Sequence, residues 1–230
     1  MNKYDFELNM NTDNSNSVIL RNIKPSTRVL DIGCAYGRMT KYLKEQLQCT
    51  TFIAEIDASA GKVASRWADM FFIGEDGDIE NPDFFTNLKA CGCDNIDYII
   101  FADVLEHVRF SNSILEQSKK ILSKDGSVWI SIPNIGHNSV LIDLWNNKFN
   151  YTDTGLLDNT HIKFFTEDSI KRIVDNCGFK IVSSYNLINA VDCTEFNNSY
   201  FDVPPMVAYL MKNRTNAEVY QFVWELKINE

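Results

Sequence analysis

The chain has 230 residues, of which 45% are hydrophobic and 23% charged, the balance of a globular protein with room for one full core. Its 22 Lys and Arg residues against 31 Asp and Glu give a net charge of -9, which argues against a nonspecific grip on nucleic acid or anionic membrane. The start of the chain lacks a signal-peptide pattern, and no apolar run approaches the length of a membrane helix. We therefore expect a cytoplasmic protein with no nucleic-acid partner and no membrane-inserted segment.

Strand-like and helix-like segments alternate along the first 133 residues, after an irregular lead-in over residues 1–17. Short apolar runs predict buried strands at 28–32, 50–55, 70–73, 97–101 and 127–132. Helical spacing predicts helices at 18–23, 38–48, 58–67, from Pro82 onward and at 112–122, with a turn at 124–126. Five such alternations predict an α/β fold with a doubly wound parallel sheet and helices on both faces.

The alternation stops after Pro133. Residues 134–161 are polar, rich in asparagine and aromatic residues, with one short helix expected at 140–145. A long irregular segment inside a compact domain usually has a function, so we interpret 134–161 as an inserted substrate lid. Thr166 then caps a helix that Gly178 ends, and two final strands are expected at 179–185 and 219–228. No shift in composition marks a boundary, which predicts a single domain over 1–230.

The first strand ends in the loop VLDIGCAYGRMT, whose glycines allow a sharp turn and close approach to a ligand. A dinucleotide fold requires GxGxxG here, but the frame from Gly33 places Ala35 and Arg38 at the other two glycine positions. The pattern is instead DxGxxxG, formed by Asp31, Gly33 and Gly37. A carboxylate at this point repels a pyrophosphate and favours a cationic amino-acid ligand.

Acidic residues also follow the next two strands. Glu55 ends the second strand, where a carboxylate suits the two hydroxyls of a ribose. Asp78 and Ile79 follow the third strand and would meet an adenine edge and face. Because the carboxyl ends of parallel strands share one edge of the sheet, these acids are expected to gather around one ligand.

On these motifs the chain resembles the class I S-adenosylmethionine-dependent methyltransferases. The resemblance spans roughly residues 21–185 and includes VLDIGCAYG, AEID, GDIE, DYIIFADVLEHV and LSKDGSVWISIPN. It implies a Rossmann-like, mixed seven-stranded sheet with one antiparallel strand near the C-terminus. It also implies S-adenosylmethionine as cofactor, with S-adenosylhomocysteine as product. The residues that it implies for cofactor binding are Asp31, Gly33, Cys34, Ala35, Gly37, Glu55, Ile56, Asp78, Ile79, Ala102 and Asp103.

The stretch from Pro133 to the motif HIKFFT is similar to a bacterial subgroup of these enzymes associated with glycosyltransferases and polysaccharide biosynthesis. That similarity implies O-methylation of a small hydroxylated acceptor, such as a sugar or glycoconjugate. A hydroxyl must lose its proton, and histidine titrates near neutral pH. We therefore predict His107 or His161 as the catalytic base.

Asp103, Glu106 and His107 share one face of a turn, and His161 lies far along the chain. This set resembles the four ligands of metal-dependent ubiquinone-pathway and small-RNA-end O-methyltransferases, with Asp in place of the first Glu. The alternative is that the histidines cap a helix or orient a loop without a metal, and we predict a site without one. Two other functions stay open: an NAD(P)-dependent oxidoreductase, against which the missing GxGxxG and Tyr-x-x-x-Lys argue, and a non-catalytic cofactor-binding regulatory protein.

Overall fold

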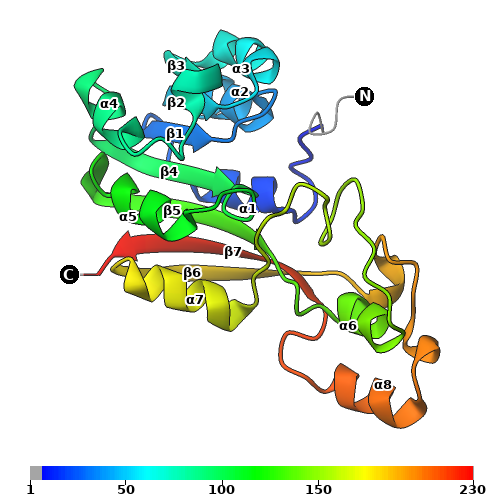
Figure 1. Cartoon of the computed structure of the whole chain (residues 1–230). Coiled ribbons are helices and arrows are strands. Elements are labelled where there is room, and N and C mark those ends of the chain that lie inside the picture. The colour runs from blue at the N-terminus through cyan, green and yellow to red at the C-terminus, as the bar shows by residue number, and fades with distance from the viewer. Residues whose placement is uncertain (1–6, 230) are drawn as a thin grey trace.

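The computed structural model describes residues 7–229, which build one seven-stranded sheet in the order β3-β2-β1-β4-β5-β7-β6 (Figure 1). The strands are β1 (Arg28–Ile32), β2 (Thr50–Glu55), β3 (Met70–Ile73), β4 (Ile96–Ala102), β5 (Leu122–Pro133), β6 (Phe179–Ile188) and β7 (Val219–Ile228). Strands β1 to β5 pair in parallel, whereas β7 runs antiparallel to both β5 and β6. The predicted mixed sheet with one antiparallel strand near the C-terminus is confirmed.

Helices connect the strands and cover the sheet. They are α1 (Ser15–Asn22), α2 (Arg38–Glu45), α3 (Ala58–Ala64), α4 (Phe84–Ala90), α5 (Ser111–Ser118), α6 (Asn138–Trp145), α7 (Glu167–Asn176) and α8 (Pro205–Lys212). Side chains of α4, α5 and α7 join one core cluster on one face of the sheet, while α1 and α2 join a second cluster on the other face. In β1, Leu30 and Ile32 point into the first cluster and Val29 into the second, as the pleat of a strand requires. Helices on both faces are thus confirmed.

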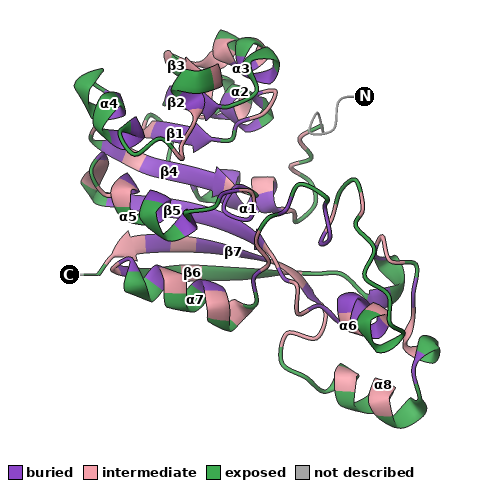
Figure 2. Ribbon diagram, viewed as in Figure 1, coloured by how far each residue is buried: buried purple, intermediate pink, exposed green. Residues whose placement is uncertain are grey.

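The burial pattern follows this layering. Figure 2 shows β4 and the inner part of β5 almost wholly buried, whereas most residues of β6, at the edge of the sheet, are exposed or half-buried. A central parallel strand covered on both faces reads as a continuous apolar run, which explains why the sequence predicts these strands well. None of the helices within residues 7–229 is both long and apolar enough to cross a bilayer.

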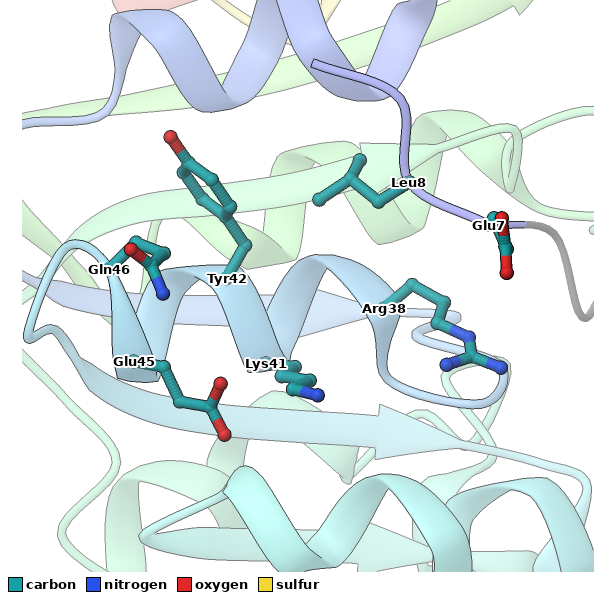
Figure 3. Close-up of a pocket in the computed structure, with 7 residues that line it drawn as sticks. All are labelled: Glu7, Leu8, Arg38, Lys41, Tyr42, Glu45 and Gln46. Atoms are coloured by element: carbon teal, nitrogen blue, oxygen red, sulfur yellow. The ribbon is translucent and has the colours of Figure 1, made fainter.

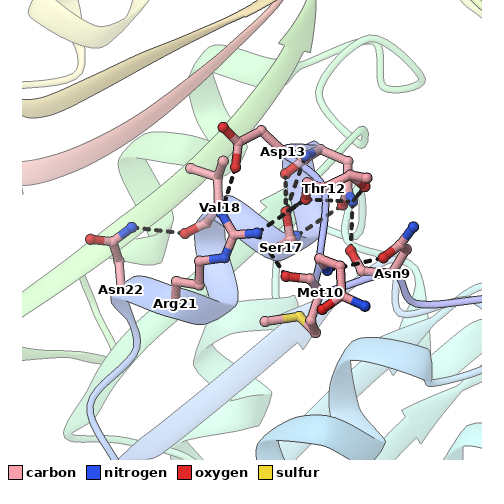
Figure 4. A network of polar contacts seen from close by, with 10 residues as sticks. Asn9, Met10, Thr12, Asp13, Ser17, Val18, Arg21 and Asn22 are labelled. Carbon is pink, nitrogen blue, oxygen red and sulfur yellow. Dashed lines mark hydrogen bonds and ion pairs between the residues drawn. The ribbon is translucent and has the colours of Figure 1, made fainter.

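Helix α1 begins earlier than the sequence predicts, because Asn14 caps it. The Asn14 side chain accepts a hydrogen bond from the Ser17 amide, and the Ser17 hydroxyl accepts one from the Asn14 amide. Arg21 ties the preceding segment to the helix through Asp13 and the Met10 carbonyl (Figure 4). This part of the expected lead-in is therefore ordered by hydrogen bonds, while residues 1–6 of it lie outside the described residues.

Two other local predictions are wrong. The stretch 124–126 is not a turn between elements but part of β5, where pairing with β4 skips from Leu122 to Ser127 and the extra residues bulge out. Helix α4 is expected from Pro82 but begins at Phe84. The Asn81 side chain accepts a hydrogen bond from the Asp83 amide, which holds residues 81–83 in a turn. The helices α2 and α5 also end sooner than their helical spacing suggests.

Two inserts made of helices and loops follow β5 and β6 in the chain. The post-β5 insert is residues 134–161 with α6, and the post-β6 insert is residues 189–218 with α8, a helix that the sequence reading missed (Figure 1). Side-chain amides join them: Asn138 donates to the Tyr200 hydroxyl at 2.8 Å, and Asn198 donates to the Ser139 carbonyl at 2.8 Å. The inserts therefore pack as one unit beside the edge that carries the predicted site.

Candidate functional site

The loop after β1 is shaped by its glycines. Gly33 and Gly37 have φ angles of 67° and 73°, in the left-handed region that favours glycine. A Cβ on Gly33 would lie 2.7 Å from Val104 Cγ2, and one on Gly37 would lie 2.8 Å from the Cα of Ala64. The loop is thus held between the segment after β4 and helix α3, with no room for larger side chains at these positions.

Two carboxylates lie beneath this loop. Asp31 is only 2% exposed and accepts a hydrogen bond from the Thr40 hydroxyl at 2.6 Å. Burial raises the pKa of Asp31 to about 6, and the nearby charge of Glu55 adds to the rise. Glu55 accepts the amides of Ala35 at 2.7 Å and Asp57 at 2.9 Å, so it fastens the loop to the end of β2. The structure therefore brings the first two predicted acids together.

The ends of β2 and β3 supply further predicted residues. Ile56 is 65% exposed, while Cys34 is buried, which raises the pKa of its thiol well above the usual range. Asp78 is partly exposed and accepts the Glu80 amide at 2.9 Å, and Ile79 packs against the core. An exposed apolar side chain and a carboxylate thus stand at this edge, as an adenine site would need.

Asp103 follows Ala102 at the end of β4, in a left-handed conformation with φ of 55°. Its amide donates to the Ser131 hydroxyl at 2.9 Å, and its carboxylate accepts from that hydroxyl at 3.0 Å and from the Gln221 amide. The Ser15 hydroxyl of α1 lies 3.5 Å from the other oxygen. A strained backbone fixed by β5, β7 and α1 is typical of a functional position.

The two predicted catalytic histidines meet at this edge, with ring centroids 4.8 Å apart. His107 Nδ1 lies 3.2 Å from the Thr160 carbonyl oxygen, and His161 Nδ1 lies 3.3 Å from that of Leu156. Because a carbonyl only accepts, these contacts favour the neutral tautomer with the proton on Nδ1 and the lone pair on Nε2. The Thr160 hydroxyl also lies 3.2 Å from His107 Nδ1 and can accept the same proton. The post-β5 insert therefore sets the tautomer of both histidines.

Glu106 lies under the histidines, only 1% exposed, and neither carboxylate oxygen has a hydrogen-bond partner among the described residues. Burial raises its pKa well above the usual range, and the charges of Asp103 and Asp158 raise it further. One ligand atom each from Glu106, His107 and His161 lie within 4.8 Å of one another, a donor set that a divalent ion accepts. Asp103, the fourth expected member, is instead bonded to Ser131 and Gln221.

An aromatic group adjoins His161, formed by Phe149 and Tyr151 of the post-β5 insert and by Phe164, which follows the insert. Phe164 lies 6.1 Å from the His161 ring, and Phe149 and Tyr151 pack edge to face at 5.5 Å while remaining 44% and 56% exposed. The sequence indicates that residues 134–161 are rich in aromatic side chains, but it gives no local signal for Ser131 and Gln221. A separate hollow of about 270 Å³ lies between the N-terminal segment and α2, lined by Leu8 and Tyr42 among others (Figure 3).

Comparisons with known proteins agree with this architecture. A family model described as a methyltransferase domain matches residues 9–184. A SAM-dependent methyltransferase from Archaeoglobus fulgidus is 17% identical, with 93% of this chain and 94% of that chain covered and a TM-score of 0.60. A putative methyltransferase from Bacillus halodurans is 12% identical, with 93% and 98% covered and a TM-score of 0.62.

A SAM-dependent methyltransferase from Thermotoga maritima, described as a possible histamine N-methyltransferase, is 13% identical, with 93% and 87% covered and a TM-score of 0.56. No match is found among curated protein sequences. The family match covers most of the chain, and the sheet order and loop geometry fit it. The chain therefore belongs to the methyltransferase-domain family and is an S-adenosylmethionine-dependent methyltransferase.

Proposed function

We propose that this enzyme O-methylates a small hydroxylated acceptor, such as a sugar or glycoconjugate, under a lid formed by residues 134–161. The observation that carries the proposal is the edge-to-face pair of histidines, His107 and His161, each with Nδ1 directed at a carbonyl of the insert. Their Nε2 lone pairs suit proton removal from a hydroxyl, a step that O-methylation requires.

The proposed cofactor site lies at the ends of β1 to β4. When bound, S-adenosylmethionine supplies an electrophilic methyl group. Asp31 and Glu55 would hold its cationic and ribose parts, and Asp78 with Ile56 its adenine. The remaining residues that we assign to this site are Gly33, Cys34, Ala35, Gly37, Ile79, Ala102 and Asp103. Two observations support this assignment. The loop after β1 is tightly packed, with no space for a Cβ at Gly33 or Gly37, and the Glu55 carboxylate is hydrogen-bonded to it.

The acceptor would enter between the histidines and the aromatic group beside His161. Exposed rings such as Phe149 and Tyr151 match the apolar face of a sugar or another ring. One of the two histidines would accept the proton of the acceptor hydroxyl. The bound cofactor would supply the methyl group to that oxygen, with its carbon–sulfur bond breaking and S-adenosylhomocysteine leaving. The proposal gives no step to a metal ion, although Glu106 stands beside the pair.

The test is methyl transfer from labelled S-adenosylmethionine to a panel of free sugars, nucleotide sugars, phenols and amines. We expect products with hydroxylated acceptors and a fall in kcat of about a hundredfold or more for His107→Ala or His161→Ala. S-adenosylhomocysteine binding, measured by thermal shift with NAD as comparison, should survive both substitutions. Methylation of amines alone, or unchanged turnover in both variants, would overturn the proposal. Binding of S-adenosylhomocysteine without methylation of any hydroxylated acceptor in the panel would also count against the proposed acceptor class.

A further inference from the structure

A polar chain runs from the sheet to His161 through the post-β6 insert. The Tyr220 hydroxyl on β7 lies 3.0 Å from both carboxylate oxygens of Glu195. Glu195 Oε1 also accepts the backbone amide of Leu156 at 2.7 Å. The carbonyl of that same residue accepts the Nδ1 proton of His161 at 3.3 Å. A chain of hydrogen bonds therefore links Tyr220 of β7, through Glu195 and the backbone of Leu156, to the imidazole ring of His161.

The contacts around Glu195 leave it little freedom. Leu156 is only 1% exposed, so its backbone is held by packing as well as by the carboxylate. A side chain at Gly155 would collide with that carboxylate. Burial and the Glu195 charge raise the pKa of Tyr220, which keeps its hydroxyl protonated as a donor. The link from β7 to residues 155–156 is therefore closely packed, and Tyr220 remains a hydrogen-bond donor near neutral pH.

We propose that Glu195 is a positioning residue that fixes the tautomer and ring orientation of His161 through the backbone of Leu156, whose amide it accepts and whose carbonyl faces the ring. This inference rests on the proposed function, in which His161 is one of the two candidate bases. A proton fixed on Nδ1 leaves the lone pair on Nε2, the nitrogen that can take a proton from an acceptor. The insert between β6 and β7 thus reaches the chemistry although none of its residues is near the site in sequence.

NMR of the histidine ring nitrogens tests the inference without any acceptor. The chain has three histidines, and His137 serves as an internal reference. Its Nδ1 accepts the Ser139 amide and its Nε2 donates to the Asn189 carbonyl, the opposite tautomer. We therefore expect two Nδ1–H rings and one Nε2–H ring in the unaltered protein at a pH where the rings are neutral.

Glu195→Ala should shift His161 to a mixture of tautomers, while Glu195→Gln, which keeps an acceptor oxygen, should restore the Nδ1–H form. Glu218 offers a matched control, because it also accepts a tyrosine hydroxyl within the same unit, that of Tyr200 at 2.9 Å. Glu218→Ala should leave His161 unchanged. If Glu195→Ala unfolds the chain, Tyr220→Phe gives the milder test, with Tyr200→Phe as its control.

The inference is overturned if folded Glu195→Ala and Tyr220→Phe proteins both keep the tautomer of His161 found in the unaltered enzyme. Once an acceptor is known, kcat should fall at least about tenfold in Glu195→Ala with KM for S-adenosylmethionine unchanged. A shifted tautomer together with unaffected turnover would uphold the positioning contact and refute His161 as the base. The tautomer measurement therefore tests the positioning role of Glu195, and turnover separately tests His161 as the base.

Discussion

Replacing Asp31 by Asn should make the protein more stable while weakening cofactor binding. The folded chain holds the proton of Asp31 up to about pH 6, whereas the ordinary value is 3.8. Between these values the folded state binds more protons than the unfolded state, so its stability falls as the pH rises. The difference corresponds to about 3 kcal/mol lost by pH 7 and above. An Asn side chain carries no charge and can still accept the Thr40 hydroxyl.

Urea unfolding of both proteins at a series of pH values measures this effect. We expect Asp31→Asn to match the unaltered protein below about pH 4 and to exceed it by up to about 3 kcal/mol above about pH 7. Asp57→Asn is the control of opposite sign, since hydrogen bonds from Ser59 and Ala60 lower the pKa of Asp57. Identical pH dependence of stability in Asp31→Asn and the unaltered protein would refute the reasoning. Calorimetry with S-adenosylhomocysteine should show weaker binding in the same variant.

Two further predictions concern the loop and the ion. Gly37→Ala and Gly92→Ala both place a side chain at a left-handed position, which costs about 1–2 kcal/mol, but only at Gly37 does the new Cβ meet the backbone of α3. Gly37→Ala should therefore lose at least about 1 kcal/mol more in urea unfolding, and equal losses would contradict the tight packing of the loop. Turnover should persist after dialysis against EDTA, whereas a loss that Mg²⁺ or Zn²⁺ restores would assign an ion to Glu106, His107 and His161.

The residues that we propose for the cofactor half of the site carry local sequence signals, and the structure brings several of them to one edge of the sheet. β1, β2, β3 and β7 have the predicted bounds, since each apolar run is closed by an acid, a glycine or a change of period. The acids of this half stand within a few residues of a strand end, and parallel pairing alone brings them to one edge. The turn expected at 124–126 was wrong because a bulge and a turn share the same residues.

The acceptor half could be predicted only in part. The sequence indicated both histidines and the aromatic group, but not Glu195, Ser131 or Gln221. Those side chains come from distant positions and carry no periodicity, so only tertiary contacts show their place. Asp103, which the resemblance to metal-dependent enzymes would group with Glu106, His107 and His161, is instead hydrogen-bonded to β5 and β7 from a backbone with left-handed φ.

The contact between the two histidine rings depends on the position of the post-β5 insert. His107 stands beside the end of β4, whereas His161 belongs to the post-β5 insert, and no strand pairing joins them. Their contact exists because the insert lies against the sheet, where the Glu106 carbonyl accepts the amides of Ile162 and Lys163 at 3.0 Å. Opening of the insert would separate the rings and release both Nδ1 protons from their carbonyls. If the proposed function holds, the arrangement that would accept the proton is complete only with the insert in place, so proton removal would require a closed acceptor site.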